Sequence, residues 1–243
     1  MGGTLKKISN PSLIRRNQQI GTYSQLGGMF ILIGGVVASY MWKDQLAIPY
    51  LALIGGFILV NVGATFNNRW GRVPPPDQAV DDLLKGLDDH YTLVHFRLGA
   101  DHALFTPGGT VAILAKYERG LVAYDGKKWH QTGVSGLQKF FGTEALGNPA
   151  LDAEAEAAAL TKRLRKILKI DEVPPVRPVV VFVYDKTRVE CDTAPLPALH
   201  ASKLKDYIRH LPKQAALTPE QLQQVLDSIG ETKKQSGSSK PAD

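Results

Sequence analysis

Few residues in this sequence of 243 amino acids have types and spacings that suit chemistry. The most suggestive spacing lies in Thr110–Tyr117, a β-prone run, and the residue after it. If this run is a strand, Leu114, Lys116 and Glu118 share one face, with Glu118 about 6.6 Å beyond Lys116. A surface lysine on a strand gives the same pattern, so the spacing alone leaves a catalytic and a structural interpretation open.

Other catalytic patterns are missing from the sequence. The six histidines show neither an HExxH motif nor metal-type spacing with cysteine. The single cysteine, Cys191, has no obvious activator and excludes an intramolecular disulfide framework. No nucleophile-elbow, P-loop or dinucleotide motif occurs. Gly108 and Gly109 form a turn signal without the helix and Lys-Ser/Thr pair that a phosphate cradle needs.

Residues 150–169 have a helical pattern with an uneven charge distribution. Acids fill the first half and bases fill the second half, an order that suits the helix dipole and is typical of a solvated face. The basic half is nevertheless a candidate for binding nucleic acid or lipid headgroups. Its members are Lys162, Arg163, Arg165 and Lys166.

Two long uncharged runs, 23–42 and 46–66, precede all of these residues. A helix of twenty residues is about 30 Å long, which is the thickness of the hydrocarbon layer of a bilayer. Only Lys43, Asp44 and Gln45 separate the runs, so we expect an antiparallel transmembrane hairpin. The near absence of a polar face favours this interpretation over two buried core helices, and the second run that follows at once argues against a cleaved signal peptide. Small residues spaced four apart recur inside both runs: Gly35 with Ser39, and Ala52 with Gly56.

The charges that flank the two runs predict their orientation. The first 43 residues contain no acid, and cations precede the first run and follow the second. The positive-inside rule then places both termini and the following domain in the cytoplasm, with two spans in the cytoplasmic membrane. The lipid bilayer is therefore a predicted partner. We expect residues 1–22 to form a basic segment attracted to anionic lipids.

After a Pro-rich linker at 67–76, residues 77–230 are predicted to form one α+β domain, followed by a disordered tail at 231–243. The expected helices are 77–87, 150–169, 201–211 and one that starts at Thr218 and ends at Gly230. The expected strands are 91–98, 103–105, 110–117 and 120–124 as an antiparallel meander, and 178–184 as a buried central strand with 188–191 beside it.

The segment Asp101–Lys116, followed by Gly120–Trp129, resembles the centre of the nuclease-related domain, NERD. Gly147-Asn148-Pro149 and Pro178–Phe182 resemble the helix start and the strand that come next in this family. The resemblance covers roughly 77–230. It implies a restriction-endonuclease-like α/β domain, so the expected fold class is α+β, with an N-terminal transmembrane hairpin before a cytoplasmic NERD-type domain.

The resemblance also implies where a catalytic site would lie. In nuclease-type cores, one acid, and a second acid two residues before a lysine, bind Mg²⁺ and polarise a phosphodiester. The first acid falls on Asp101 and the lysine on Lys116, while an acid of the first helix falls on Asp77.

The match to this pattern is incomplete at two positions. Leu114 stands where the family has the second metal-binding glutamate, and Asp152 stands where it has a glutamine. Leucine offers no oxygen to Mg²⁺, so a primary ligand is lost. Glu118 is the one residue on the same strand face that could replace it.

Three functions therefore remain open. We expect the first: a membrane-anchored, catalytically degenerate domain without a cofactor, with a nucleic-acid-binding or scaffolding role. The second is a Mg²⁺-dependent nuclease with Asp101, Lys116 and Glu118 as catalytic residues and Asp101, Asp77 and Asp152 as metal ligands. The third is a structural membrane protein whose soluble part binds a protein partner.

Overall fold

The computed structural model describes residues 3–45, 47–134 and 146–237, with side chains up to residue 230. The chain divides into two compact units. One unit is the segment Asn10–Gln78, and the other combines the residues up to Ser9 with those from Ala79 onward. The second unit is therefore discontinuous in sequence, and the first is inserted into it.

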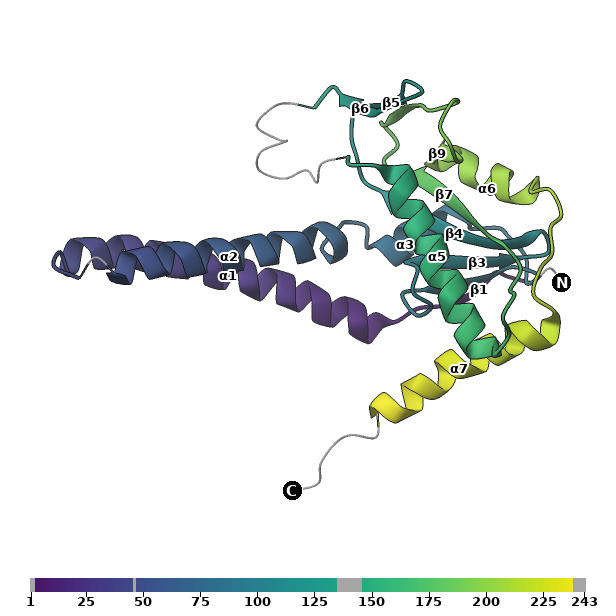
Figure 1. Ribbon diagram of the computed structural model, residues 1–243, viewed down its shortest axis with the longest axis horizontal. Helices are drawn as coiled ribbons and strands as arrows, with labels where there is room; N and C mark the ends of the chain where they lie inside the picture. The colour runs from purple at the N-terminus through teal and green to yellow at the C-terminus, as the bar shows by residue number, and fades with distance from the viewer. Residues whose placement is uncertain (1–2, 46, 135–145, 238–243) are drawn as a thin grey trace. The chain divides into compact units, whose positions relative to one another are not determined.

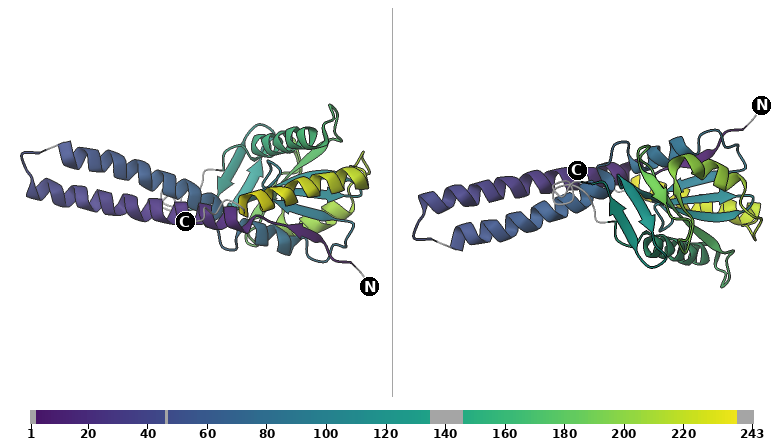
Figure 2. Two further views of the ribbon diagram at one scale, coloured as in Figure 1. Left: turned by 90° about the horizontal axis from the view of Figure 1, so that it is seen from below. Right: turned by 90° about the horizontal axis from the view of Figure 1, so that it is seen from above.

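The inserted unit contains two long helices, α1 (Pro11–Met41) and α2 (Ala47–Trp70), which run side by side as a hairpin (Figures 1 and 2). Both are long and apolar enough to be candidates for spanning a membrane. Helix α1 starts twelve residues before the expected span, and α2 extends to Trp70, which leaves only 71–75 of the expected linker 67–76 before the next helix.

Polar contacts between the helices explain the extra turns. The side chain of Asn10 caps α1 by accepting a hydrogen bond from the Leu13 amide. Gln18 Nε2 donates to the Trp70 carbonyl at 2.9 Å, and Asn67 Nδ2 donates to Gln25 Oε1 at 2.6 Å. The hairpin therefore continues as a polar helix pair beyond its apolar part.

Glycines form the seam between α1 and α2. Gly21, Gly28 and Gly35 of α1 are buried at seven-residue intervals, as are Gly56 and Gly63 of α2. A Cβ atom added at Gly28 would lie 2.7 Å from the Val60 amide nitrogen and 2.8 Å from the Gly56 carbonyl oxygen. Because glycine has no side chain, the backbones of the two helices are in direct contact at these positions.

The second unit is built on a six-stranded sheet with the order β1-β2-β3-β4-β7-β9 (Figure 1). Strands β2, β3 and β4 form an antiparallel meander as expected, but the fourth strand predicted for it, 120–124, was wrongly placed, because it pairs in a separate sheet. Strand β7 pairs in parallel with both β4 and β9. The strand bounds are β1 Lys6–Ile8, β2 Thr92–His95, β3 His102–Thr106, β4 Gly109–Lys116, β7 Val176–Phe182 and β9 Ala198–His200.

Strand β1 was not expected from the sequence, which predicted only a basic segment at 1–22. It pairs in parallel with β2 at the edge of the sheet. Leu5, just before β1, is 7% exposed and belongs to the core, and its amide donates to the Leu87 carbonyl at 3.1 Å. After the strand, the Ser9 carbonyl accepts a hydrogen bond from Arg97 Nε at 3.2 Å.

Two layers of helices cover the sheet. Helices α3 (Pro76–Leu83) and α6 (Ala201–Arg209) pack on one face, where Val80, Leu84, Leu204 and Ile208 are buried. Helices α5 (Pro149–Leu168) and α7 (Pro219–Gly237) pack on the other face (Figure 1). This three-layer arrangement confirms the predicted mixed α/β class.

A second, three-stranded sheet has the order β6-β5-β8, with bounds Trp129–Thr132, Leu121–Tyr124 and Arg188–Glu190. The sequence placed 188–191 beside the central strand at 178–184, and this was wrong. β8 pairs with β5 instead, because the Arg188 amide donates to the Gly120 carbonyl at 2.9 Å and starts a parallel ladder there.

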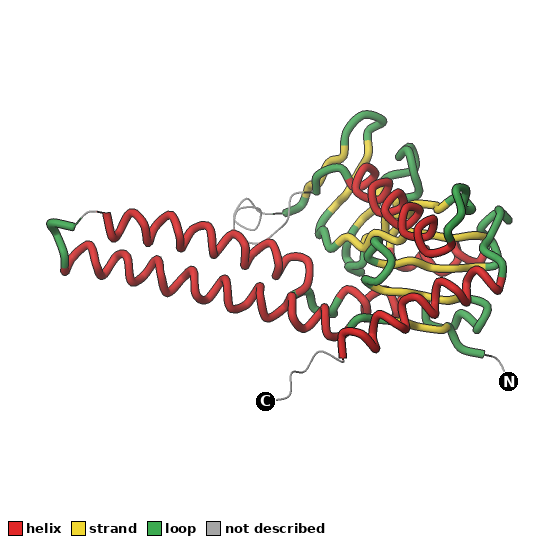
Figure 3. The backbone as a smooth tube through the Cα atoms, turned by 60° about the horizontal axis from the view of Figure 1, so that its bottom comes forward, coloured by secondary structure: helices red, strands yellow, loops and turns green. Residues whose placement is uncertain are grey.

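The C-terminal helix also differs from the prediction. Helix α7 does not end at Gly230 but continues to Gly237, so the first part of the expected tail at 231–243 is helical (Figure 3). A glycine inside a helix costs only about 1 kcal/mol relative to alanine, and the residues that follow Gly230 are mostly adequate helix formers. The remaining tail residues, 238–243, lie outside the described residues.

Candidate functional site

The candidate site lies where β4 and β7 end. These strands are parallel, with Lys116 paired to Phe182, so their carboxyl ends meet at one edge of the sheet. This edge is where ligands bind in open α/β sheets. Lys116 is the last residue of β4 and is only 9% exposed.

Two carboxylates approach the ammonium group of Lys116. Asp152 Oδ2 lies 3.1 Å from Lys116 Nζ, and Glu118 Oε1 lies 3.9 Å from it. Asp152 reaches this point from the first turn of α5, which starts at Pro149 with Asn148 as its cap. The Asn-Pro pair therefore sets the position of Asp152 at the sheet edge.

Glu118 lies beyond the end of β4, and a loop contact holds its backbone in place. Its carbonyl accepts a hydrogen bond from Thr187 Oγ1 at 2.7 Å, and its side chain is 6% exposed. The sequence placed Glu118 near Lys116 by strand alternation. In the structure the strand has already ended, so the loop after β7, which contains Thr187, fixes this residue.

Asp101 directly precedes β3, the strand that pairs with β4. Strands β3 and β4 are antiparallel, and His102 of β3 pairs with Ile113 of β4. If the same register is continued by one residue, Asp101 lies opposite Leu114. The Asp101 amide donates to Glu156 Oε2 at 3.2 Å. Glu156 follows Asp152 by four residues on α5, so both acids face the ends of the strands.

Sequence reasoning did not select Glu156, although its four-residue spacing from Asp152 was a usable signal. Asp77 is the fourth predicted acid. It lies in the first turn of α3, within the part of that helix that belongs to the hairpin unit. The domain unit therefore provides two groups of contacts in this region, Lys116 with Glu118 and Asp152, and the Asp101 amide with Glu156, and these five residues are named here the sheet-edge cluster.

Leu114 is the main obstacle to a metal site at this edge. Its side chain is 9% exposed and belongs to an apolar cluster that includes Val180 and Phe182. Mg²⁺ requires near-octahedral oxygen coordination and keeps several of its waters. Here an apolar side chain takes the ligand position, and the ammonium of Lys116 already lies beside two carboxylates. Leu114 therefore cannot supply the oxygen ligand that the family resemblance implies at its position.

The cations predicted on α5 lie far from this cluster. Lys162, Arg165 and Lys166 are exposed and Arg163 is half-buried. Lys166 is fourteen residues after Asp152, which corresponds to about 21 Å along a helix. The fold does not bring this basic group to Lys116.

Other cations do lie at the sheet edge, and sequence reasoning missed them. Arg119, Lys186 and Arg188, named here the edge cations, are exposed in the segments that follow β4 and β7. The guanidinium carbon of Arg119 lies 4.9 Å from the centre of the Tyr184 ring. Tyr117 packs edge-on against the same ring, with a centroid distance of 5.7 Å. Arg119 and Tyr117 thus both contact Tyr184, and the three edge cations lie in the segments that follow the ends of β4 and β7.

Two of the six histidines, His95 and His102, are buried in the domain. Each is 1% exposed, and their Nδ1 atoms lie 2.7 Å apart, so one ring donates to the other. His95 Nε2 contacts Asp81 Oδ1 at 3.2 Å, and Lys7 Nζ contacts Asp81 Oδ2 at 3.2 Å. Burial by itself raises the pKa of Asp81, but the hydrogen bonds and charges of His95 and Lys7 outweigh this effect and lower it.

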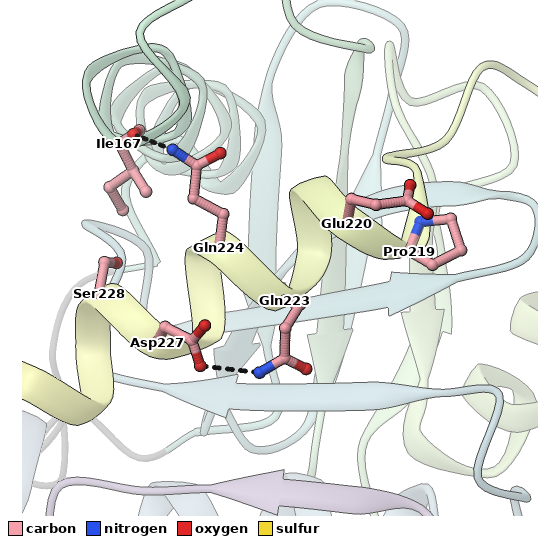
Figure 4. A pocket seen from close by; sticks show the side chains of 7 residues that line it. All are labelled: Ile167, Pro219, Glu220, Gln223, Gln224, Asp227 and Ser228. Atoms are coloured by element: carbon pink, nitrogen blue, oxygen red, sulfur yellow. Dashed lines mark hydrogen bonds between the residues drawn. The ribbon is translucent and has the colours of Figure 1, made fainter.

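Two further features lie apart from the cluster. Asp88, Asp89 and His90 could hold a metal ion by distance, but all three are exposed and Asp88 accepts hydrogen bonds from His90. A hollow between α5 and α7 is lined by polar residues of α7, and Gln224 Nε2 donates there to the Ile167 carbonyl at 3.2 Å (Figure 4). Neither feature includes a residue of the sheet-edge cluster.

Comparison with known proteins gives one match. Residues 76–183 match the family model described as the nuclease-related domain, NERD. No curated protein and no solved structure shows a significant match to the chain.

Proposed function

This chain carries a nuclease-related domain at residues 76–183, and we propose that the domain is catalytically degenerate, is anchored to a membrane by the hairpin α1–α2, and binds nucleic acid. The proposal combines three parts: loss of the metal site, retention of a cationic surface, and membrane attachment.

The observation on which the proposal mainly depends is the environment of Leu114. A nuclease of this type needs a carboxylate at that position, directed at the metal ion. Leu114 instead packs into the core, and Lys116 Nζ lies 3.1 Å from Asp152, a contact that neutralises the lysine without a metal. The ammonium of Lys116 is thus paired with carboxylates of the protein itself.

The edge cations support nucleic acid as the ligand. Arg119, Lys186 and Arg188 can contact phosphates, and the ring of Tyr184 can stack on a base where Arg119 leaves a face accessible. Residues 77–230 contain 19 lysines and arginines against 20 acids, so the attraction to a polyanion depends on where the cations lie and not on the net charge of the domain. These residues follow the ends of β4 and β7, where the substrate of an active nuclease of this family would lie. A nucleic-acid strand bound there would therefore take the same path as that substrate.

Membrane attachment is supported by helix length, composition and flanking charge. Arg15, Arg16, Arg69 and Arg72 flank the open end of the hairpin, whereas Lys43 and Asp44 balance each other at its turn. The chain connectivity adds an independent reason, since β1 before the hairpin and β2 after it pair in one sheet. Both ends of the hairpin must then lie on the same side of a membrane that it enters, and the positive-inside rule makes that side the cytoplasm.

The test of binding uses the full chain in detergent and a fluorescent single-stranded oligonucleotide. We expect an affinity that falls as salt rises. Replacing the three edge cations with glutamine should weaken binding and reduce the slope of log K against log salt by about 2. The matched control replaces Lys162, Arg165 and Lys166 with glutamine and should have the smaller effect. If the two variants lose affinity equally, the edge is not the binding surface.

A second candidate, a Mg²⁺-dependent nuclease with a displaced carboxylate, is favoured by one observation. The carboxylates of Glu118 and Asp152 converge on Lys116, and Glu156 contacts the amide of Asp101. Cleavage of single-stranded or plasmid DNA by the full chain in Mg²⁺ or Mn²⁺, abolished by Asp101→Ala, would establish this function. We expect no cleavage above the background of the Asp101→Ala variant.

A further inference from the structure

Asn61 is a polar residue inside the more apolar of the two long helices. Helix α2 has a mean hydropathy of 1.9 over its most apolar window, against 1.4 for α1. The carboxamide of Asn61 is exposed, and its Nδ2 donates to the Phe57 carbonyl at 2.8 Å. Within the described residues this carboxamide has no further hydrogen bond, so its oxygen and its second N–H remain able to bond.

The direction of Asn61 follows from the seam of the hairpin. The buried residues of α2 are Gly56, Gly63 and Trp70. At 3.6 residues per turn, Asn61 lies about 200° around the helix from Gly63 and about 140° from Gly56. Asn61 therefore points away from α1, on a face that it shares with Ile54 and Ile58, each 57% exposed.

The depth of Asn61 makes this exposure costly in a bilayer. Arg69, the nearest charged residue on α2, follows eight residues later, or about 12 Å along the helix axis. An asparagine side chain is too short to span that distance and reach the headgroups, unlike the long side chains that do so. A polar group held in hydrocarbon is unfavourable unless it is hydrogen-bonded.

We infer that a second copy of this chain covers this face of α2, with Asn61 of each copy hydrogen-bonded to Asn61 of the other. The carboxamide is both a donor and an acceptor, so it is complementary to itself across a two-fold axis. A second copy inserts in the same orientation and presents its Asn61 at the same depth. Ile54 and Ile58 then pack around the amide pair, and the glycine seam remains engaged within each hairpin.

This inference rests on the membrane insertion that is part of the proposed function, and the experiment separates the two. The full chain carries Cys191→Ala and Lys203→Cys, so that one cysteine can be labelled with a donor or an acceptor dye. The labelled protein is reconstituted into phospholipid vesicles, which are floated on a density gradient. Energy transfer is then measured in the floated vesicles as the ratio of protein to lipid is lowered. The variants are Asn61→Leu, which removes the amide, and Asn61→Gln, which keeps it. Gln19→Leu is the control, since it removes an exposed amide from the polar end of α1.

For the unmodified sequence we expect energy transfer that increases with the ratio of protein to lipid. The dissociation constant of the dimer should be about 3- to 30-fold higher for Asn61→Leu. It should change little for Asn61→Gln and Gln19→Leu. Leucine suits a lipid-facing helix, so loss of transfer in Asn61→Leu would not reflect failure to insert. Two results would overturn the inference. One is protein that floats with the vesicles but shows no more energy transfer than randomly distributed molecules would give, and the other is equal energy transfer in Asn61→Leu and the unmodified sequence. Protein that does not float would overturn the membrane anchor and the inference with it.

Discussion

Lys116 is the residue on which the charge balance of the candidate site depends. Its ammonium group is nearly buried and lies close to Asp152 and Glu118, one exposed and one buried. Removal of one member of a buried ion pair leaves the other charge in a poorly solvated place, which is costlier than removal of both. A lysine that is simply exposed on the surface would not show this difference between removal of one charge and removal of both.

We predict that Lys116→Met destabilises the domain by about 3 kcal/mol, because the charge of Glu118 loses its ammonium partner. The double variant Lys116→Met with Glu118→Gln should recover most of this loss. Thermal unfolding of the full chain in detergent measures both. A single variant that unfolds at the same temperature as the unmodified chain would show that Lys116 is not part of the stabilising cluster.

Asp81 connects the first strand to the buried histidine pair, since its two carboxylate oxygens contact Lys7 and His95. Its pKa is lowered in the folded state relative to an ordinary value near 4. A lowered folded pKa means that the carboxylate stabilises the fold above the unfolded pKa, and that this contribution disappears as the pH falls through the folded pKa.

The predicted consequence is a loss of stability below about pH 4 that depends on Asp81. The variant Asp81→Asn should be less stable than the unmodified chain near neutral pH, and the difference should shrink as the pH approaches 3. Melting temperatures over this range provide the measurement. A difference that stays constant with pH would mean that the Asp81 charge has no role in it.

Among the elements, the hairpin depends on its glycine seam. Gly28 faces backbone atoms of α2, whereas a Cβ atom at Gly34 would meet nothing within 4 Å. The two positions are six residues apart on the same helix and differ only in what they face. They form a matched pair for testing whether close backbone contact holds the hairpin together.

We predict that Gly28→Ala destabilises the hairpin by about 1–3 kcal/mol through overpacking, and that Gly34→Ala is neutral or slightly stabilising. Titration of the detergent-solubilised chain with a denaturing detergent, followed by circular dichroism of the helices, compares the two. Equal midpoints for both variants would contradict the packing of α1 on α2 through Gly28.

Strand β1 is the element that makes the domain discontinuous. Leu5 belongs to the core on the face covered by α3 and α6, and its neighbour Lys6 is exposed. We predict that Leu5→Ala lowers the stability of the domain by about 2–3 kcal/mol and that Lys6→Ala changes it by less than about 0.5 kcal/mol. Chemical unfolding of the two variants tests this. An unaffected Leu5→Ala would mean that β1 is not part of the folded sheet.

On the scale of the whole molecule, connectivity constrains topology. The hairpin leaves the domain after β1 and returns to it at α3, so one side of a membrane would hold the sheet and both ends of the hairpin. The opposite side would hold only the turn that includes Asp44. The domain would then be attached to the membrane by two chain segments instead of one.

Single cysteines in a Cys191→Ala background test this topology. We predict that a membrane-impermeant maleimide labels Asp44→Cys in intact cells and labels Lys203→Cys only after the membrane is permeabilised. Both positions are exposed, so the difference depends on the membrane. The reverse pattern would invert the orientation, and equal labelling of both in intact cells would exclude a membrane barrier between them.

Local patterns in the sequence were sufficient for most helices and for three of the four strands predicted as a meander. The length and uniform apolarity of 23–42 and 46–66 predicted two helices, and the Asn-Pro pair at 148–149 predicted the start of α5. The resemblance to the nuclease-related domain was also visible in the sequence, in Asp101–Lys116, Gly120–Trp129 and the segments around 147–149 and 178–182, and the family model matches residues 76–183. These features depend on neighbouring residues, whose periodicity and capping act within a few turns or one strand.

Only the tertiary structure could decide features that join distant residues. The pairing of β1 with β2 spans more than eighty positions, and a three-residue strand has no distinctive pattern of its own. The segments that carry the edge cations follow β4 and β7, which are parallel neighbours, and no spacing in the sequence shows this pairing. Likewise, the sequence identifies Leu114 as an apolar residue, but only the structure shows that it packs in one cluster with Val180 and Phe182. Such contacts are formed by chain closure over long separations, and local residue preferences do not encode them.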